Sequence, residues 1–346
     1  MVMINDDKGG TLGNVYDQDC PMFDPTKICF RMLRKTDHRS YNDGKDIDKN
    51  IPVVWEDWEP YKPGEGDWWH ALEEKSDTYP IRDNDFVITA CMTTQDHLWP
   101  VPYVYNNYHF VQTHYANLDT QINFTADREF FADVLLGNSK PHRLAFYKMM
   151  EESNMLDKNI VHLFNVYRSD FLDNVKDDMQ AMIDDNPNNE YPATTLLLNG
   201  KFISQYISAP IMESSWISVV GETLDDNDIF FVTEKTAKPL MAGRPFIMLG
   251  GVNYLKHLRN LGFKTFAPVI DESYDDVVAY DKRVQSAFNS FKKLSEQDPK
   301  EILSKLAPVL EHNRRIMYDQ HKLTQSARRF LGDLHTRYAY DPKSKH

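Results

Sequence analysis

The stretch Phe230-Phe231-Val232-Thr233-Glu234-Lys235 and its continuation Phe246-Ile247-Met248-Leu249-Gly250-Gly251 decide the fold of this chain. The first apolar run is typical of a buried strand, and the charged pair after it opens a short helix. The second apolar run is typical of another buried strand and ends in glycines. A strand, a helix and a strand in this order predict two parallel strands joined by a helical crossover.

The charged turn of this segment suits a ligand that is part sugar and part phosphate. The Glu234 carboxylate can accept hydrogen bonds from ribose hydroxyls, whereas the Lys235 ammonium and the helix N-terminus favour negative charge. Ligands of open parallel sheets bind beyond the carboxyl ends of the strands, which is where this turn falls. The alternative is a capping role, with Thr233 as the N-cap of the helix, or a surface ion pair.

Apolar runs spaced by helical patterns continue on both sides of the turn. Strands are predicted at residues 131–136, 160–164, 217–220, 229–232, 246–249 and 264–267. Helices are predicted from residue 234 and at residues 142–153, 171–183 and 253–261. This alternation predicts a parallel sheet covered by helices on both faces, and therefore the α/β class.

The sequence divides into three predicted parts. They are an aromatic-rich α/β domain at residues 1–128, a Rossmann-like domain at 129–270 and a helical C-terminal segment at 271–346. Strands of the first domain are predicted at residues 86–91, 101–104 and 110–112. Pro299 and Pro308 are expected to break the C-terminal helical pattern.

The composition is that of an ordinary globular protein, because 41% of the 346 residues are hydrophobic and 26% are charged. No apolar run approaches the roughly 20 residues that span a bilayer, and the polar start lacks the pattern of a signal peptide. We therefore expect a cytoplasmic protein without a membrane partner. The cysteines Cys20, Cys29 and Cys91 lack CxxC spacing, which argues against a zinc site or a disulfide framework.

The formal net charge of -13 argues against a surface that binds polyanions throughout. Basic residues gather after Asn313, where a solvated helical face is the simplest interpretation and a local basic patch is the alternative. The chain has no Gly-x-Ser-x-Gly elbow, no Walker loop and no Gly-x-Gly-x-x-Gly fingerprint. These absences argue against serine hydrolases, P-loop NTPases and dehydrogenases.

Residues 231–250 resemble the nucleotide-sugar-binding segment of the alpha-1,3-fucosyltransferases, a two-domain GT-B family. Members of that family carry an aromatic-Val-Thr-Glu-Lys turn, a helix and a strand with small residues, Gly and Pro. The resemblance implies that Thr233, Glu234 and Lys235 bind the donor, with Glu234 on the ribose and Lys235 on a phosphate. Phe231 stands where the family usually has Tyr. The implied architecture is GT-B-like, with two Rossmann-like domains and a helical C-terminal tail.

A second match is the loop Asn138-Ser139-Lys140-Pro141-His142-Arg143-Leu144. It is similar to the fucosyltransferase loop whose Arg clamps the donor diphosphate from the start of a helix. An Arg can bond two oxygens and offset the charge of a leaving nucleotide, which implies this role for Arg143. The alternative is an Arg143 that is capped against its helix or paired with Glu151 or Glu152. Lys238 and Arg168 are further candidate donor ligands.

Three later segments resemble glycosyltransferase-like proteins of phages: Gly250-Gly251-Val252-Asn253, Phe263-Lys264-Thr265-Phe266 and Asp271-Glu272-Ser273-Tyr274-Asp275. The resemblance covers roughly residues 130 to 280. We therefore expect transfer of a sugar from a nucleoside-diphosphate sugar to a hydroxyl acceptor. One candidate acceptor is 5-hydroxymethylcytosine in double-stranded phage DNA, which would place the protein in the host cytoplasm. The alternatives are a glycan- or protein-directed glycosyltransferase, and a nucleotide-binding module without catalytic activity.

The sequence predicts a transferase that needs neither a metal nor a further cofactor. Asp83-Asn84-Asp85 and Asp226-Asn227-Asp228 have the Asp-x-Asp form with which metal-dependent glycosyltransferases hold a cation. In those enzymes the motif follows a strand, whereas both triplets here precede an apolar run. We interpret them as turns.

An inverting transferase also needs a general base that deprotonates the attacking hydroxyl. Asp96 and His97 are the first candidates, because they follow the strand predicted at residues 86–91. Glu56 and Asp57 are the second candidates, because tryptophans flank them and can stack against rings. His114 is the third.

Overall fold

The computed structural model describes the backbone of residues 31–34, 53–57, 86–89, 91–93, 103–105, 108–124, 127–175, 197–198, 201–225, 227–319, 321–323 and 325. Contacts group the chain into two compact units, Met1–Tyr108 with His321–His346, and His109–Gln320. The three-part division at residues 128 and 270 stays a prediction. The helices that follow residue 271 pack within the second unit.

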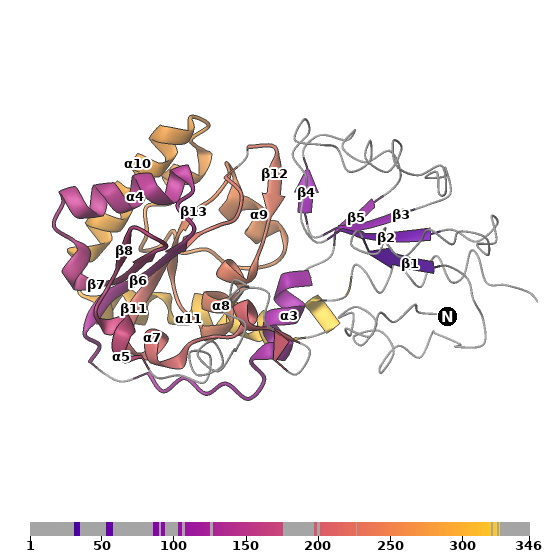
Figure 1. The fold of residues 1–346 in the computed structure, drawn as a ribbon, viewed down its shortest axis with the longest axis horizontal. Coiled ribbons are helices and arrows are strands. Elements are labelled where there is room, and N and C mark those ends of the chain that lie inside the picture. The colour runs from indigo at the N-terminus through magenta and orange to yellow at the C-terminus, as the bar shows by residue number, and fades with distance from the viewer. Residues whose placement is uncertain are drawn as a thin grey trace, which may run out of the picture. The chain divides into compact units, whose positions relative to one another are not determined.

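The first unit contains a parallel sheet in the strand order β1-β2-β3-β5 (Figure 1). Its strands are β1 (Arg31–Arg34), β2 (Val53–Asp57), β3 (Phe86–Thr89) and β5 (Tyr103–Tyr105), and a further short strand, β4, spans Cys91–Thr93. The strands predicted at residues 86–91 and 101–104 are confirmed in their main part by β3 and β5. Glu56 and Asp57 are the last residues of β2, at the carboxyl end of this sheet.

The second unit is built on a sheet in the order β13-β11-β6-β7-β8. Its strands are β6 (Phe130–Gly137), β7 (Asn159–Leu163), β8 (Tyr167–Arg168), β11 (Ser215–Gly221) and β13 (Phe246–Leu249). Neighbouring strands are parallel except β8, which pairs with β7 in the antiparallel sense. Every residue of β11, and of β13 at one edge of the sheet, is buried, as expected for parallel strands that helices cover on both faces.

Helices cover both faces of this sheet, which confirms the α/β class (Figure 1). On one face lie α4 (Pro141–Glu152) and α10 (Tyr280–Ser295), whose Phe146 and Phe291 rings pack together. On the other lie α5 (Phe171–Asn174), α7 (Ala209–Ser214) and α8 (Glu234–Ala242). The remaining helices are α3 (Tyr108–Ala116), α9 (Tyr254–Asn260) and α11 (Pro299–Tyr318), of which α11 packs against α8.

Short elements complete the second unit. Strand β12 (Ile229–Phe231) precedes α8, and β9 (Leu197–Leu198) pairs in the antiparallel sense with β10 (Lys201–Phe202). Turns of 3-10 helix occur at Leu156–Lys158, Ile203–Gln205 and Ser273–Asp276. The predicted strands and helices between residues 131 and 261 are confirmed as elements, with one exception. Helix α5 ends at Asn174, well before the predicted 183, and residues 176–183 lie outside the described part.

The predicted pairing of the two strands around α8 was wrong, because β12 is not a strand of the five-stranded sheet and β13 pairs with β11. An apolar run indicates a buried strand but not its partner.

Three other sequence-based predictions were wrong. Residues 110–112 belong to α3 and not to a strand, because a short apolar run alone does not distinguish the two. Residues 264–267 form no strand, since the Lys264 and Phe266 amides donate to the side chains of Asn313 and Glu272. Pro308 lies inside α11 without ending it, and Pro299 begins that helix, where its missing amide hydrogen costs nothing.

A buried ion pair joins the sheet to the segments around it. The Arg244 guanidinium lies 2.6 Å from the Asp133 carboxylate and donates to the carbonyls of Met212, Ser215 and Ile217. Both side chains are almost fully buried, and the hydroxyls of Ser215 and Ser218 also donate to Asp133. Removing one partner would leave a buried charge uncompensated.

We predict that Asp133→Asn lowers the free energy of unfolding by about 3–5 kcal/mol, because it leaves the Arg244 charge without its counter-ion. Urea denaturation of the full chain measures this. The matched control is Glu311→Gln, which removes the exposed partner of Arg315 and should cost less than about 1 kcal/mol. Equal effects of the two substitutions would contradict the structural role of the buried pair.

Candidate functional site

The polar groups of the second unit converge where the strand order of its sheet reverses. From β6 the chain passes through α4 to β7 on one side, whereas β11 lies on the other side of β6. The crevice between the carboxyl ends of β6 and β11, hereafter the switch point, is where doubly wound sheets bind their ligands. Both strands end there in a glycine, Gly137 and Gly221.

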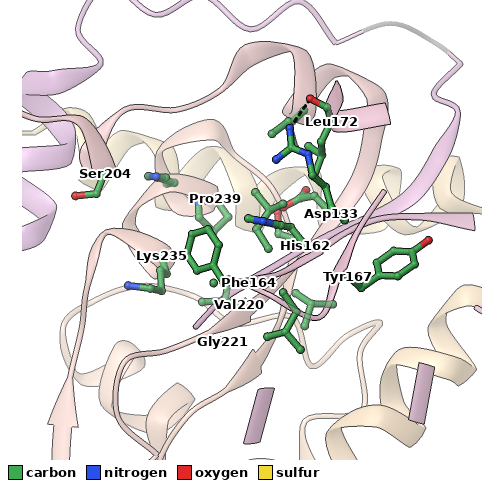
Figure 2. Close-up of a pocket in the computed structure, with 18 of the residues that line it drawn as sticks. Asp133, His162, Phe164, Tyr167, Leu172, Ser204, Val220, Gly221, Lys235 and Pro239 are labelled. Carbon is green, nitrogen blue, oxygen red and sulfur yellow. Dashed lines mark hydrogen bonds between the residues drawn. The ribbon is translucent and has the colours of Figure 1, made fainter. Parts of the chain in front are cut away.

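A cavity of about 830 Å³ opens beside the switch point, within the range of 300–1,000 Å³ usual for small-molecule sites (Figure 2). The sheet contributes lining residues from β6, β7, β8 and β11, and the helices α5, α7 and α8 contribute others. The turn between β7 and β8, the residue after α5 and the 3-10 turn at Ile203–Gln205 complete the lining. Glu234, Lys235 and Lys238 from the first turns of α8 give it a charged wall. The cavity therefore offers one charged end and a largely apolar floor.

Thr233 is the N-cap of α8, which confirms the capping interpretation for this residue. Its hydroxyl accepts from the Lys235 amide at 3.3 Å and donates to the Glu222 carboxylate at 2.7 Å. Both functions of the hydroxyl are thus used within the protein. Thr233 shapes the turn at residues 233–235 and leaves ligand contact to its neighbours.

The fully buried Glu222 carboxylate anchors this turn, and sequence reasoning missed it. It accepts hydrogen bonds from the amides of Thr233 and Thr223 and from the hydroxyls of Thr233, Thr236 and Tyr254. The signal in the sequence was a carboxylate two residues after the strand predicted at residues 217–220. A buried carboxylate needs such donors, so Glu222 fixes where α8 begins relative to β11.

Arg143 lies at the switch point but is turned into the protein. Its guanidinium donates to the carbonyls of Glu222 at 2.7 Å and Asn138 at 3.3 Å, and the residue is only 3% exposed. Gly221 gives it room, because a Cβ there would lie 3.1 Å from Arg143 Cγ. The carboxylate of Glu151, an alternative partner, accepts instead from Tyr147. Arg143 thus joins the loops after β6 and β11.

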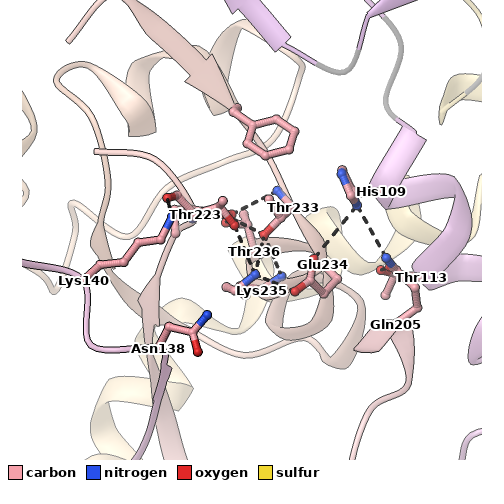
Figure 3. A network of polar contacts seen from close by, with 12 residues as sticks. His109, Thr113, Asn138, Lys140, Gln205, Thr223, Thr233, Glu234, Lys235 and Thr236 are labelled. Carbon is pink, nitrogen blue, oxygen red and sulfur yellow. Dashed lines mark hydrogen bonds and ion pairs between the residues drawn. The ribbon is translucent and has the colours of Figure 1, made fainter. Parts of the chain in front are cut away.

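Two lysine ammoniums meet at Thr223, the residue after Glu222 (Figure 3). Lys140 Nζ donates to the Thr223 carbonyl at 2.6 Å, and Lys235 Nζ lies 3.3 Å from the Thr223 hydroxyl. Lys235 Nζ is also 2.6 Å from Glu234 Oε1. Lys235 is a ligand predicted from the sequence, whereas Lys140, from the loop before α4, is identified by the structure alone.

The Glu234 carboxylate is held in its charged form. Burial raises the pKa of Glu234, but Lys235, His109 and Lys238 outweigh this effect and bring the pKa down to about 2. His109 Nδ1 lies 4.0 Å from Glu234 Oε2 (Figure 3). At neutral pH Glu234 is therefore a pure hydrogen-bond acceptor, as a ribose-binding carboxylate must be.

Lys238 lies one helical turn further along α8 and lines the cavity. Burial lowers its pKa from 10.5 to about 8, with a raising effect of Glu234 and a lowering effect of Lys235. Such an ammonium gains from a bound anion, since the anion compensates part of the lost solvation.

Helix α3 contributes a second set of residues that the sequence analysis did not identify. Thr113 donates to Gln205 Oε1 at 2.7 Å, which turns the Gln205 amide nitrogen towards His109 Nδ1 at 3.4 Å. The edge of the His109 ring also packs against Phe231. This network holds His109 beside Glu234.

The other predicted site residues lie in different places. Phe231 is buried under His109, and its ring is not among the residues that line the cavity. Arg168 lines the cavity, but its guanidinium donates to the Asp173 carboxylate and the Leu172 carbonyl. His114 is buried and bonds the Met317 carbonyl at 2.9 Å, which is a structural role. Asp96 and His97 lie outside the described residues.

No group of three or more His, Cys, Asp or Glu suited to a metal ion occurs among the described residues. Of the two Asp-x-Asp triplets, only Asn227 and Asp228 are described; they form a bend, and Asn227 accepts from Arg283 at 3.0 Å. Metal independence stays a prediction.

The described helices include none that is both long and apolar enough to cross a membrane.

Comparison with known proteins adds no family assignment. The sequence matches no protein-family model, and a search of curated proteins finds no similar sequence. The resemblance to the fucosyltransferases therefore stays a prediction that depends on the residues of the two loops.

We predict that Glu222→Gln lowers the free energy of unfolding by about 1–3 kcal/mol, because the amide cannot accept from all the buried donors. Guanidinium denaturation measures the loss. Glu301→Gln, in a side chain that is 68% exposed and paired with Lys305, serves as the control and should cost clearly less. If Glu222→Gln were as stable as the wild type, the anchoring role would be wrong.

Proposed function

We propose that this protein is a GT-B-like glycosyltransferase that binds a nucleoside-diphosphate sugar in the cavity beside α8. One observation carries the proposal: an ionised carboxylate and two ammoniums, those of Glu234, Lys235 and Lys238, line a cavity at the switch point of a parallel sheet. A nucleotide sugar offers both the hydroxyls and the diphosphate that these groups can bind.

The chemistry follows from where the charges lie. Glu234 accepts hydrogen bonds from the ribose hydroxyls, and Lys235 exchanges its contact with Glu234 for one with a phosphate oxygen. Lys238 and the N-terminus of α8 add positive potential. As the bond between sugar and phosphate breaks, negative charge grows on the leaving diphosphate, and these groups stabilise it. Nothing in this step requires a cation from outside the protein.

Arg143 takes a supporting part in this proposal. Its guanidinium donates to the Glu222 and Asn138 carbonyls and so holds the two loops together. Its positive charge adds to the potential at the site from a buried position. Burial lowers the pKa of Arg143 from its ordinary value, and the nearby carboxylates, first that of Glu222 and then that of Glu234, offset part of this effect. Arg143 is therefore a positioning residue.

The acceptor hydroxyl needs a general base, for which Asp96 and His97 stay the first candidates and Glu56 and Asp57, at the carboxyl end of β2, the second. The acceptor itself is proposed from the resemblance to phage proteins, and 5-hydroxymethylcytosine in DNA is the first choice. The charge of -13 favours the alternative of a glycan or protein acceptor. A nucleotide-binding module without turnover would use the same cavity.

We predict that UDP or GDP raises the melting temperature of the full chain, and that Lys235→Ala weakens the binding at least about tenfold through loss of a charged hydrogen bond. Isothermal titration calorimetry measures the affinity. Lys256→Ala, an exposed lysine of α9, is the matched control and should bind like the wild type. Absence of binding of any nucleoside diphosphate would overturn the proposed function.

The lowered pKa of Lys238 predicts a pH dependence of anion binding. Lys238 is protonated below about pH 8 and neutral above it, so nucleoside-diphosphate affinity should fall between pH 7 and pH 9. Titrations of the wild type and of Lys238→Met at both pH values measure this. The fall should be smaller in the variant, and an equal fall in both proteins would show that another group causes it.

A further inference from the structure

An aromatic ring lies half exposed at the edge of the cavity. Phe164 follows directly after β7, lines the cavity and keeps 49% of its surface exposed. Figure 2 shows its ring on the side of the cavity where Lys235 lies. Exposed phenylalanines are common on protein surfaces. Whether this ring binds a ligand must therefore be judged from the residues around it.

Phe164 is held in place by the loops of the switch point. Its amide donates to the Gly137 carbonyl at 2.8 Å, and the His162 ring packs against it at 4.7 Å in a T-shaped arrangement. Gly137 adopts a positive φ of 65°, and a Cβ there would lie 3.9 Å from the Phe164 ring. A ring fixed in this way loses little conformational entropy when a ligand covers it.

Three exposed apolar side chains line the same cavity. Leu135, Phe164 and Val166 are all at least about one third exposed, and all three line the cavity. Others among the described residues, such as Val278, are not part of its lining. The cavity thus combines an apolar patch with an aromatic ring and, from α8, a wall of two ammoniums and a carboxylate.

We propose that Phe164 is the platform on which the base of a nucleoside diphosphate stacks, with the diphosphate directed towards Lys235 and Lys238. This inference rests on the proposed function and adds the orientation of the donor within the cavity. A ring face accepts every base, because each base has a π-face. Phe164 therefore contributes affinity for the base in general and does not distinguish purines from pyrimidines.

The test compares ligands that share the diphosphate but differ in the base. Calorimetric titrations of the full chain use UDP, GDP and inorganic pyrophosphate. Phe164→Ala should weaken UDP and GDP binding by about 5- to 150-fold, the range of base stacking on aromatic side chains, and leave pyrophosphate binding unchanged. Val278→Ala, which removes a side chain that is 66% exposed outside the cavity, should change none of the three affinities.

A second variant keeps the test independent of any loss of stability. Phe164→Trp should retain the affinity for UDP and GDP. Its added tryptophan fluorescence, measured as the difference from the wild type, should change on addition of either nucleotide but not of pyrophosphate. The same response to pyrophosphate, or no response to a nucleotide that binds, would overturn the inference.

The outcomes separate this inference from the proposed function. If Phe164→Ala binds UDP or GDP as the wild type does, the base lies elsewhere and the inference fails, while the donor site stands. Equal weakening of nucleotide and pyrophosphate binding would also overturn it, since Phe164 would then shape the phosphate site. If the wild type binds no nucleoside diphosphate, the proposed function fails together with the inference.

Discussion

The structure of the site depends on one buried carboxylate, that of Glu222. Its hydrogen bonds join the end of β11 to the start of α8 and to Tyr254 of α9. Gly250 makes the last of these possible, because a Cβ there would lie 2.9 Å from the Tyr254 ring. A carboxylate that is buried away from water is stable only when protein groups donate hydrogen bonds to it. The end of β11, the start of α8 and α9 can therefore adopt only a narrow set of relative positions.

This constraint explains why the charged residues of α8 are presented as they are. The Thr233 hydroxyl donates to Glu222 and accepts from the Lys235 amide. Glu234 and Lys235 are therefore the first side chains of the helix that can bind a ligand. Lys235 reaches back to Thr223, next to the anchor, and Lys140 reaches the same residue from the loop after β6. When a diphosphate binds, Lys235 has only to exchange its contact with Glu234 for one with a phosphate oxygen. The positive charge is therefore largely in place beforehand, which favours electrostatic stabilisation.

Much of the second unit could be predicted from the sequence. The strands from residue 130 to residue 249 are apolar runs of strand length separated by helical patterns, and the charged turn has the N-cap residue that its helix requires.

The parts that could not be predicted depend on contacts between distant segments. The donors of Glu222 come from residues 223 to 254, and Arg143 is turned inwards by carbonyls that only the folded sheet places beside it. The strand predicted at residues 110–112 was wrong for the same reason. Helix α3 is held by hydrogen bonds that His114 and Asn117 make to residues far away in the sequence.

The central claim is that the cavity beside α8 holds the donor of a sugar transfer. Mass spectrometry of the full chain tests it most directly, after incubation with a pool of nucleotide sugars together with hydroxymethylated DNA and glycan acceptors, with and without EDTA. We expect an acceptor whose mass rises by one sugar and a released nucleoside diphosphate, both unchanged by EDTA and both strongly reduced in Lys235→Ala. Intact donors and acceptors under all of these conditions would contradict it.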